Sequence, residues 1–315
     1  MDILDINEVS KSYANHLALD MVSIRIPEGS VFGLLGPNGA GKTSLIRIIT
    51  QITAPDSGTI LFRGKPLMRE HVNRMGYLPE ERGLYKKMEV GEQALYLARL
   101  KGLSRSDAMT KLKYWFEKFE IQAWWNKKVE ELSKGMAQKV QFVSTILHDP
   151  EFLILDEPFT GFDPINAELI KQELLELKKN GTTIVLSTHR MESVEELCSH
   201  ISLINHAKLI LEGPVKDLRK QYKSNEFEVL YSGNRISFTH ALWTGFELLD
   251  LHEDGEHNVA RVKLLGSNTT NDLLHVLLPE VKVLGLREIV PDMNDIFIKT
   301  VNDSQNLKEQ IQPVS

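Results

Sequence analysis

One stretch of this sequence leaves few choices of fold: an apolar run that leads into a glycine-rich loop and then into a helical pattern. Val31 to Leu35 is apolar apart from one glycine, as in a strand buried on both faces. The loop from Gly36 to Thr43 follows directly, and Ser44 to Ile52 places its apolar residues on one helical side. This order predicts a phosphate-binding loop in an α/β domain with a parallel sheet.

The loop residues are suited to hold the phosphates of ATP. Its glycines let backbone N–H groups turn towards phosphate oxygens, and the helix start adds favourable partial charge. Lys42 is expected to reach the β- and γ-phosphates, while Thr43 offers its hydroxyl to Mg²⁺. The residues expected to contact ATP here are Gly36, Pro37, Asn38, Gly39, Ala40, Gly41, Lys42, Thr43 and Ser44.

Two adjacent carboxylates follow a second apolar strand, Phe152 to Leu155. Because parallel strands deliver their carboxyl ends to one edge of the sheet, both carboxylates are expected beside the phosphates. Asp156 is predicted to hold Mg²⁺ through water, which leaves Glu157 to act as general base on the attacking water. His189 follows the next strand and is expected to contact the γ-phosphate and orient that water.

A helix start lies between the phosphate loop and the carboxylates. Ser133 and Gly135 precede the apolar-patterned segment Met136 to Leu147, and a helix start attracts an anion. Within one chain, this start is not expected to reach the loop at Gly36. The sequence therefore predicts a head-to-tail dimer with two-fold symmetry, in which Ser133 and Gly135 close on the ATP held by the partner.

With these motifs in this order, the chain resembles the nucleotide-binding subunit of an ABC transporter over roughly residues 2 to 220. The resemblance implies ATP and Mg²⁺ as ligands, and a second ATPase subunit, which we expect to be an identical copy. It assigns Tyr13 to stacking on adenine, with a place in the core as the alternative, and Asp163 to the loop between the two ATP sites. It also implies a separate multi-spanning permease, received near Lys86 and Lys87, which otherwise are solvated surface.

Two residues depart from the family pattern. Glu80 stands where the family usually has glutamine; it keeps an oxygen for catalysis and for the metal, but adds a negative charge. Lys134 stands where the family usually has glycine, and is predicted either to bring a further cation near the partner's γ-phosphate or to point into solvent.

Both departures, together with a small C-terminal domain that ends near Pro291 to Phe297, resemble the sodium- and drug-export branch that works with ABC-2 type permeases. We therefore expect an ATP-hydrolysing subunit that powers export. An importer ATPase and a soluble ABC ATPase without a transport role are the alternatives.

The remaining patterns predict the domain organisation. We expect an ABC ATPase domain over residues 1–220, a P-loop NTPase core with an N-terminal antiparallel β part and a helical insertion at about 88–147. A small α+β domain follows over 221–305, and a flexible tail over 306–315. A structural or dimer-stabilising role is favoured for the small domain over a sensory one. Its expected elements are strands at 226–231, 259–264 and 281–289 and helices at 271–278 and 293–301.

Composition limits the partners and the location. The formal net charge of -6 gives no electrostatic reason to expect nucleic acid. The lone Cys198 cannot form an intramolecular disulfide and is expected to be buried, which favours a reducing, cytoplasmic setting. No apolar run approaches the roughly 18 residues of a spanning helix, and the first residues are unlike a signal peptide. We expect a cytoplasmic protein that reaches the membrane only through its permease.

Overall fold

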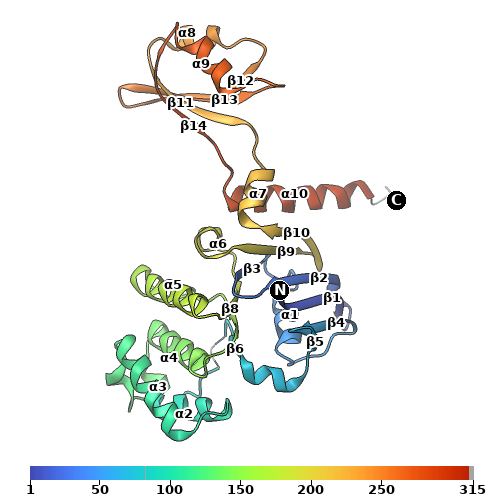
Figure 1. The fold of residues 1–315 in the computed structure, drawn as a ribbon, viewed down its shortest axis with the longest axis vertical. Coiled ribbons are helices and arrows are strands. Elements are labelled where there is room, and N and C mark those ends of the chain that lie inside the picture. The colour runs from blue at the N-terminus through green and yellow to red at the C-terminus, as the bar shows by residue number, and fades with distance from the viewer. Residues whose placement is uncertain (82, 312–315) are drawn as a thin grey trace. The chain divides into compact units, whose positions relative to one another are not determined.

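The computed structural model describes residues 1–81 and 83–311 (Figure 1). The chain forms two compact units. The first combines Met1–Val215 with the described residues from Thr300 on, and the second is Lys216–Lys299. The predicted fold class, α/β with an antiparallel part and a smaller α+β part, is confirmed.

The first unit holds an antiparallel sheet of strand order β2-β1-β4-β5 and a mostly parallel sheet of order β10-β9-β3-β8-β7-β6. The antiparallel strands are β1 (Asp2–Tyr13), β2 (His16–Pro27), β4 (Ser57–Phe62) and β5 (Lys65–Pro66). The others are β3 (Val31–Leu35), β6 (Met75–Leu78), β7 (Phe152–Asp156), β8 (Thr183–Ser187), β9 (His200–Asn205) and β10 (Lys208–Pro214). Every residue of β3, β7 and β8 is buried, as expected for central parallel strands that are covered on both faces.

The predicted N-terminal antiparallel part contains two long strands that the sequence pattern does not mark as continuous. β1 and β2 are long and pair with each other over almost their whole length. Their register shifts between Ile6 and Val9, and Glu8 has a φ of +50° there. A bulge of this kind breaks the alternation of apolar and polar residues, so the sequence pattern looks like several pieces.

Helix α1 (Lys42–Ile49) starts directly after the phosphate loop and packs with both sheets. Leu45, Ile46 and Ile49 of α1 belong to one buried cluster with residues of β1 and β3, such as Leu4 and Phe32. The phosphate loop is therefore held between a buried strand and a buried helix.

A group of helices follows, which Figure 1 draws in green. It consists of α2 (Val90–Leu100), α3 (Arg105–Lys118) and α4 (Lys134–Ile146), with short 3₁₀ turns at Gln122–Trp124 and Val129–Glu131. Ser104 caps α3 by accepting a 3.1 Å hydrogen bond from the Asp107 backbone N–H, and the spacing of these two residues resembles a capping box. A further 3₁₀ helix (Arg69–Arg74) precedes β6, and α5 (Pro164–Lys179) and α6 (Met191–Leu197) follow β7 and β8.

The second unit is a sheet of order β12-β13-β11-β14 with helices packed on one face. Phe227, Val229 and Tyr231 of β11 alternate towards this face, where the Tyr231 and Phe238 rings stack at 4.2 Å. A two-residue turn at Gly255-Glu256 joins β12 to β13, and Asp254 pairs with His257 across it. The elements are β11 (Glu226–Ser232), α8 (Arg235–Ala241), β12 (Phe246–Asp254), β13 (His257–Leu264), α9 (Thr270–Leu277) and β14 (Lys282–Glu288).

Two helices lie where the chain passes between the units. They are α7 (Val215–Gln221) and α10 (Met293–Ile311). α10 continues through Ile311, into the segment expected to form a tail, and 312–315 lie outside the described residues. Within the first unit, the Asn205 side-chain amide donates a 3.0 Å hydrogen bond to Ser304 of this helix. Over the described ranges, the structure contains no helix whose length and hydropathy suit it to crossing a bilayer.

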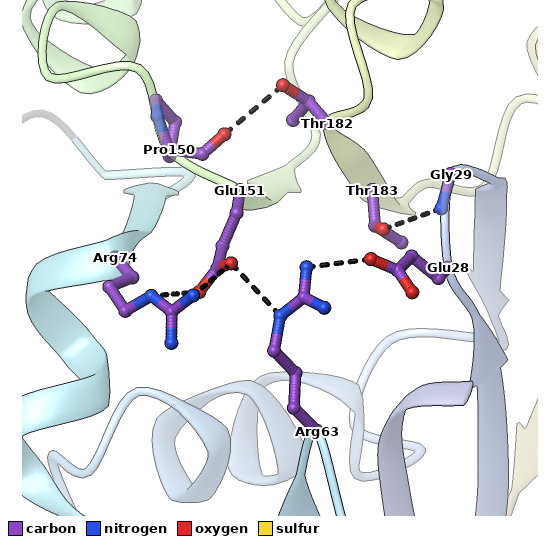
Figure 2. A network of polar contacts seen from close by, with 8 residues as sticks. All are labelled: Glu28, Gly29, Arg63, Arg74, Pro150, Glu151, Thr182 and Thr183. Atoms are coloured by element: carbon purple, nitrogen blue, oxygen red, sulfur yellow. Dashed lines mark hydrogen bonds and ion pairs between the residues drawn. The ribbon is translucent and has the colours of Figure 1, made fainter. Parts of the chain in front are cut away.

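Polar side chains join the antiparallel sheet to the parallel one, as Figure 2 shows. Arg63, which follows β4, contacts Glu28 at 2.7 Å and Glu151 at 3.0 Å. Arg74 also donates a 2.6 Å hydrogen bond to Glu151. Glu151 precedes β7, whose other end carries Asp156. This network therefore belongs to the edge of the parallel sheet opposite the predicted phosphate site.

Candidate functional site

The phosphate loop has a backbone that only glycine can adopt at two positions. Gly36 has a φ of +148°, and a Cβ there would overlap the carbonyl oxygen of Ile204. Gly41 has a φ of +119°, and a Cβ there would overlap the carbonyl oxygen of Ala18. Both the left-handed conformation and the close backbone approach exclude any larger residue.

Lys42, at the start of α1, reaches back over its own loop. Its Nζ donates to the carbonyl oxygens of Gly36 at 2.7 Å and Pro37 at 3.1 Å. Burial lowers the pKa of Lys42, while the nearby carboxylates of Glu157 and Asp156 act in the opposite direction. A buried cation held above a loop of backbone N–H groups is suited to bind phosphate oxygens.

A cavity of about 290 Å³ lies above this loop. Its walls come from the β1–β2 turn, the phosphate loop, the segment after β6 and the end of β7. The lining residues are Tyr13, His16, Ala18, Asn38, Gly39, Ala40, Gly41, Lys42, Thr43, Ser44, Glu80, Asp156 and Glu157. Most of the residues predicted to contact ATP and its metal thus line one cavity, while Gly36 and Pro37 lie beneath Lys42.

The cavity contains oxygen donors of the type that Mg²⁺ prefers. Thr43, Asp156 and Glu80 all line it. Asp156 is only 4% exposed, and burial raises the pKa of its carboxyl, with Glu80 adding to the effect. A buried carboxylate whose charged form is disfavoured is suited to a cation, which would offset that cost.

Glu157 is held by the segment that follows β8. Its Oε1 accepts a 3.0 Å hydrogen bond from the His189 backbone N–H and lies 2.6 Å from His189 Nδ1. Thr188 Oγ1 donates to Oε2 at 3.3 Å. Glu157 also has a φ of +50°, a conformation that is uncommon for a residue with a side chain. The backbone strain and these hydrogen bonds fix the carboxylate at the cavity wall.

His189 contacts Glu157, and its side chain is 62% exposed. It is absent from the lining of the 290 Å³ cavity as far as the described residues define it. A contact between His189 and the γ-phosphate remains a prediction, whereas its contact with the carboxylate of Glu157 is a feature of this structure.

Tyr13 ends β1 and pairs with His16 across a tight turn. The Tyr13 ring is 39% exposed and lines the cavity, as a side chain that stacks on a base must. His16 and Ala18 also line the cavity, although no contact with ATP was expected for them. The two-residue turn after Tyr13 was the available signal, since it returns the chain to the same cavity.

The other predicted contacts lie elsewhere. Ser133 caps α4 by accepting a 3.3 Å hydrogen bond from the Met136 N–H. Asp163 caps α5 by accepting a 3.0 Å hydrogen bond from the Asn166 N–H, which helps to keep the pKa of Asp163 low. Of the described residues, those that line the 290 Å³ cavity include neither Ser133, Gly135 nor Asp163.

A second cavity, of about 410 Å³, lies beside the segment that carries Glu80. Pro79 and Leu84 line it together with Leu97 and Leu100 of α2. It therefore connects the segment after β6 with the helical group, and its wall offers apolar side chains to a partner.

Comparison with known proteins supports one family. A family model described as ABC transporter matches residues 19–160. A second model, described as the C-terminal domain of DrrA1-3-like ATP-binding proteins, matches residues 213–301.

Two relatives and one solved structure illustrate the similarity. YhaQ of Bacillus subtilis (strain 168), described as an uncharacterized ABC transporter ATP-binding protein, is 39% identical over 299 residues, covering 95% of this chain and 98% of that protein. Nod factor export ATP-binding protein I of Rhizobium etli is 34% identical over 237 residues, covering 74% and 75%. A structure described as the ATP binding subunit of an ABC transporter matches with a TM-score of 0.65 and 29% identity, over 70% of this chain and 93% of that one.

Proposed function

This chain belongs to the family of ABC transporter ATP-binding proteins, and on that premise we propose that it hydrolyses Mg-ATP to power a separate membrane permease. One observation carries the proposal: the phosphate loop, Lys42 and the carboxylates of Asp156 and Glu157 line a single cavity. A cavity with the buried cation of Lys42 on one wall and carboxylates on another suits a nucleoside triphosphate with its metal.

ATP binds by its phosphates to the backbone N–H groups of the loop, where Lys42 exchanges its carbonyl partners for phosphate oxygens. Tyr13 stacks on the adenine. Thr43, Asp156 and Glu80 would hold Mg²⁺, which would supply positive charge to the phosphate oxygens.

Glu157 accepts a proton from the water that attacks the γ-phosphorus, and ADP and inorganic phosphate leave. The hydrogen bonds from His189 and Thr188 keep the carboxylate in place for this transfer. With Glu157 as the base, hydrolysis of the bound ATP requires only a positioned water as the second reactant.

Two chains act together. Ser133 and Gly135 stand at the start of α4 and outside the cavity lining described above, which supports their use at the ATP of a partner. A head-to-tail pair of identical chains gives each ATP a phosphate loop from one chain and an α4 start from the other.

The permease docks on the 410 Å³ cavity beside Glu80, next to the exposed Lys86 and Lys87. The segment that carries Glu80 also lines the ATP cavity, so a movement of this segment would be passed to the permease. The name of the Rhizobium etli relative supports export as the direction. The protein acts at the cytoplasmic face of the membrane, attached through the permease.

The replacement Glu157→Gln tests the hydrolytic role. The amide keeps the size of the side chain but cannot accept the proton, so we expect the hydrolysis rate to fall by about 10²–10⁴-fold. ATP binding should be retained, and a fluorescent ATP analogue together with a phosphate-release assay measures both.

Glu151→Gln is the matched control, because it makes the same chemical change just before the other end of β7. It removes the charge that pairs with Arg63 and Arg74 and so lowers stability. It should still leave the hydrolysis rate of the folded chain within about twofold, because Glu151 does not line the ATP cavity. Hydrolysis by Glu157→Gln at the rate of the unaltered chain would remove Glu157 from the role of general base.

A further inference from the structure

The first turns of α4 lie directly against the turn that follows Glu157. The Gln138 side-chain amide donates a hydrogen bond to the carbonyl oxygen of Thr160. The α-carbon of Gly135 also faces this turn, because a Cβ there would lie 3.8 Å from the carbonyl oxygen of Gly161. The helix whose start is assigned to one ATP therefore contacts the segment that carries the general base for the other.

Lys134 makes a further contact with this turn through its aliphatic stem. A Cβ added at Gly161 would lie 2.6 Å from Lys134 Cε and 2.9 Å from Cδ. Gly161 has a φ of +90° and leaves the space that the stem occupies. Lysine covers apolar and backbone surface with its methylene groups in this way, whatever its ammonium group does.

The turn after Glu157 is short and internally bonded, so it moves as one piece. The Thr160 N–H donates to the carbonyl oxygen of Glu157 at 3.2 Å, and the Phe162 N–H donates to that of Phe159 at 3.4 Å. Phe159 is buried, and Asp163 caps α5 immediately afterwards. A displacement at Gly161 is therefore transmitted to Glu157 through a few peptide units.

We propose that Lys134 and Gln138 are positioning residues that tie the α4 start to the turn carrying Glu157 within each chain. This inference rests on the proposed function, in which the α4 start serves the partner's ATP while Glu157 serves the chain's own. The stem of Lys134 then links the two ATP sites of the dimer, so the geometry of one site depends on occupancy of the other.

Lys134 is exposed as a whole, so its ammonium group can point into solvent while its stem lies against Gly161. What matters is the length of the stem. A glycine at this position, as in the usual family pattern, would leave the space above Gly161 unfilled.

A pair of replacements separates the stem from the charge. Lys134→Ala removes the stem beyond Cβ in a residue that favours helix, whereas Lys134→Met keeps an unbranched stem without the ammonium. For the full chain with saturating Mg-ATP, we expect Lys134→Ala to lower kcat by about tenfold, because a loosened base is misplaced. KM for ATP should stay within twofold and the Hill coefficient should fall towards one, while Lys134→Met should retain all three values.

The replacement Gly161→Ala tests the contact between Lys134 and Gly161 by changing the other residue. Its methyl group displaces the stem of Lys134, so we expect the same loss of kcat and of cooperativity as for Lys134→Ala. In a chain that already carries Lys134→Ala, the second replacement should add less than it does in the unaltered chain, because only the contact with Gln138 Oε1 at 3.1 Å and the backbone strain remain. Gly181→Ala is the matched control: its φ is +99° and nothing lies within 4 Å of the added Cβ, so it reports the backbone strain alone.

The outcomes are distinct. If the unaltered chain shows no hydrolysis that depends on Glu157, the proposed function and the inference both fail. If hydrolysis is normal and Lys134→Ala matches the unaltered chain, or the two replacements act additively, only the inference is overturned. Equal losses in Lys134→Ala and Lys134→Met would assign the effect to the charge and overturn the role of the stem.

Discussion

At the scale of single residues, the burial of the Asp156 carboxylate lowers the stability of the folded chain. Its carboxyl is almost completely shielded from water at the end of β7, and burial raises its pKa above the ordinary value. In the folded state the group therefore holds its proton to a higher pH than in the unfolded state. Stability consequently falls as pH rises from the unfolded pKa through the folded one, and the ionised group remains unfavourable above that window.

We predict that Asp156→Asn stabilises the chain in the absence of nucleotide and Mg²⁺. The neutral amide avoids the burial of a charge, so the free energy of unfolding at pH 7 should rise by about 1 kcal/mol, as is common where function opposes stability. Denaturant unfolding at several pH values measures the difference, which should shrink as the pH falls below the folded pKa. A lower stability of the variant at pH 7 would contradict this account, whatever happens to hydrolysis.

At the scale of elements, much of the fold follows from local pattern. β3 and β7 are covered on both faces, so their sequences are almost continuously apolar and mark the central sheet. Ser104 before Asp107 and the Asp254-Gly255 pair are short-range signals in the sequence, and the structure has a helix cap at Ser104 and a hairpin turn that begins at Gly255. The β9–β10 pair gave no such signal, because its turn uses His206 and Ala207 at positive φ, with neither glycine nor proline.

The residues of the candidate site were likewise predictable from the sequence only where they belong to a local motif. Residues that act through a local motif, such as Lys42 in its loop, lie where the motif indicates. The contacts of His189 with Glu157 and of Lys134 with Gly161 depend on how segments distant in the sequence approach each other, and no spacing records that. No motif assigns a role to His16, because only the folded chain places it on the cavity wall.

Helix α2 contains an unusual buried amide that gives a prediction at this scale. Gln93 is fully buried, and neither its Oε1 nor its Nε2 has a hydrogen-bond partner among the described residues. Because an unpaired buried amide is unfavourable, Gln93→Met should raise the free energy of unfolding by about 1–2 kcal/mol.

Chemical denaturation measures this gain, and hydrolysis should be unchanged because Gln93 is remote from the residues assigned to ATP. A loss of stability in the Met variant would mean that the amide is satisfied by water and is needed there.

At the scale of the whole molecule, the chain enters the second unit after Val215 and returns to the first at Thr300. Ser304 then accepts the hydrogen bond of Asn205, a residue only 4% exposed. The described residues from Thr300 on are thus part of the first unit, and the second is inserted within it.

This connection predicts different effects for two deletions. Replacing 216–299 by a flexible Gly/Ser linker should retain ATP binding and the stability of the first unit. Removing everything from 216 on should lower that stability by about 1–3 kcal/mol, because Asn205 loses its partner while buried. Thermal unfolding and ATP-analogue binding compare the two, and equal stability would show that the last helix contributes nothing.

The linker variant also tests the role of the second unit. Dimerisation that is unchanged by its removal would count against a dimer-stabilising function.

The two junctions at Val215 and Thr300 also bear on how such a chain can diversify. To the first unit, the whole second unit is a closed loop, and the entropy of closing a loop grows only with the logarithm of its length, by about 0.6 kcal/mol for each doubling. An independently folded insert orders its own residues, so its size has little effect on the stability of the first unit. We expect this position to accept the exchange of one small domain for another while the ATP cavity stays intact.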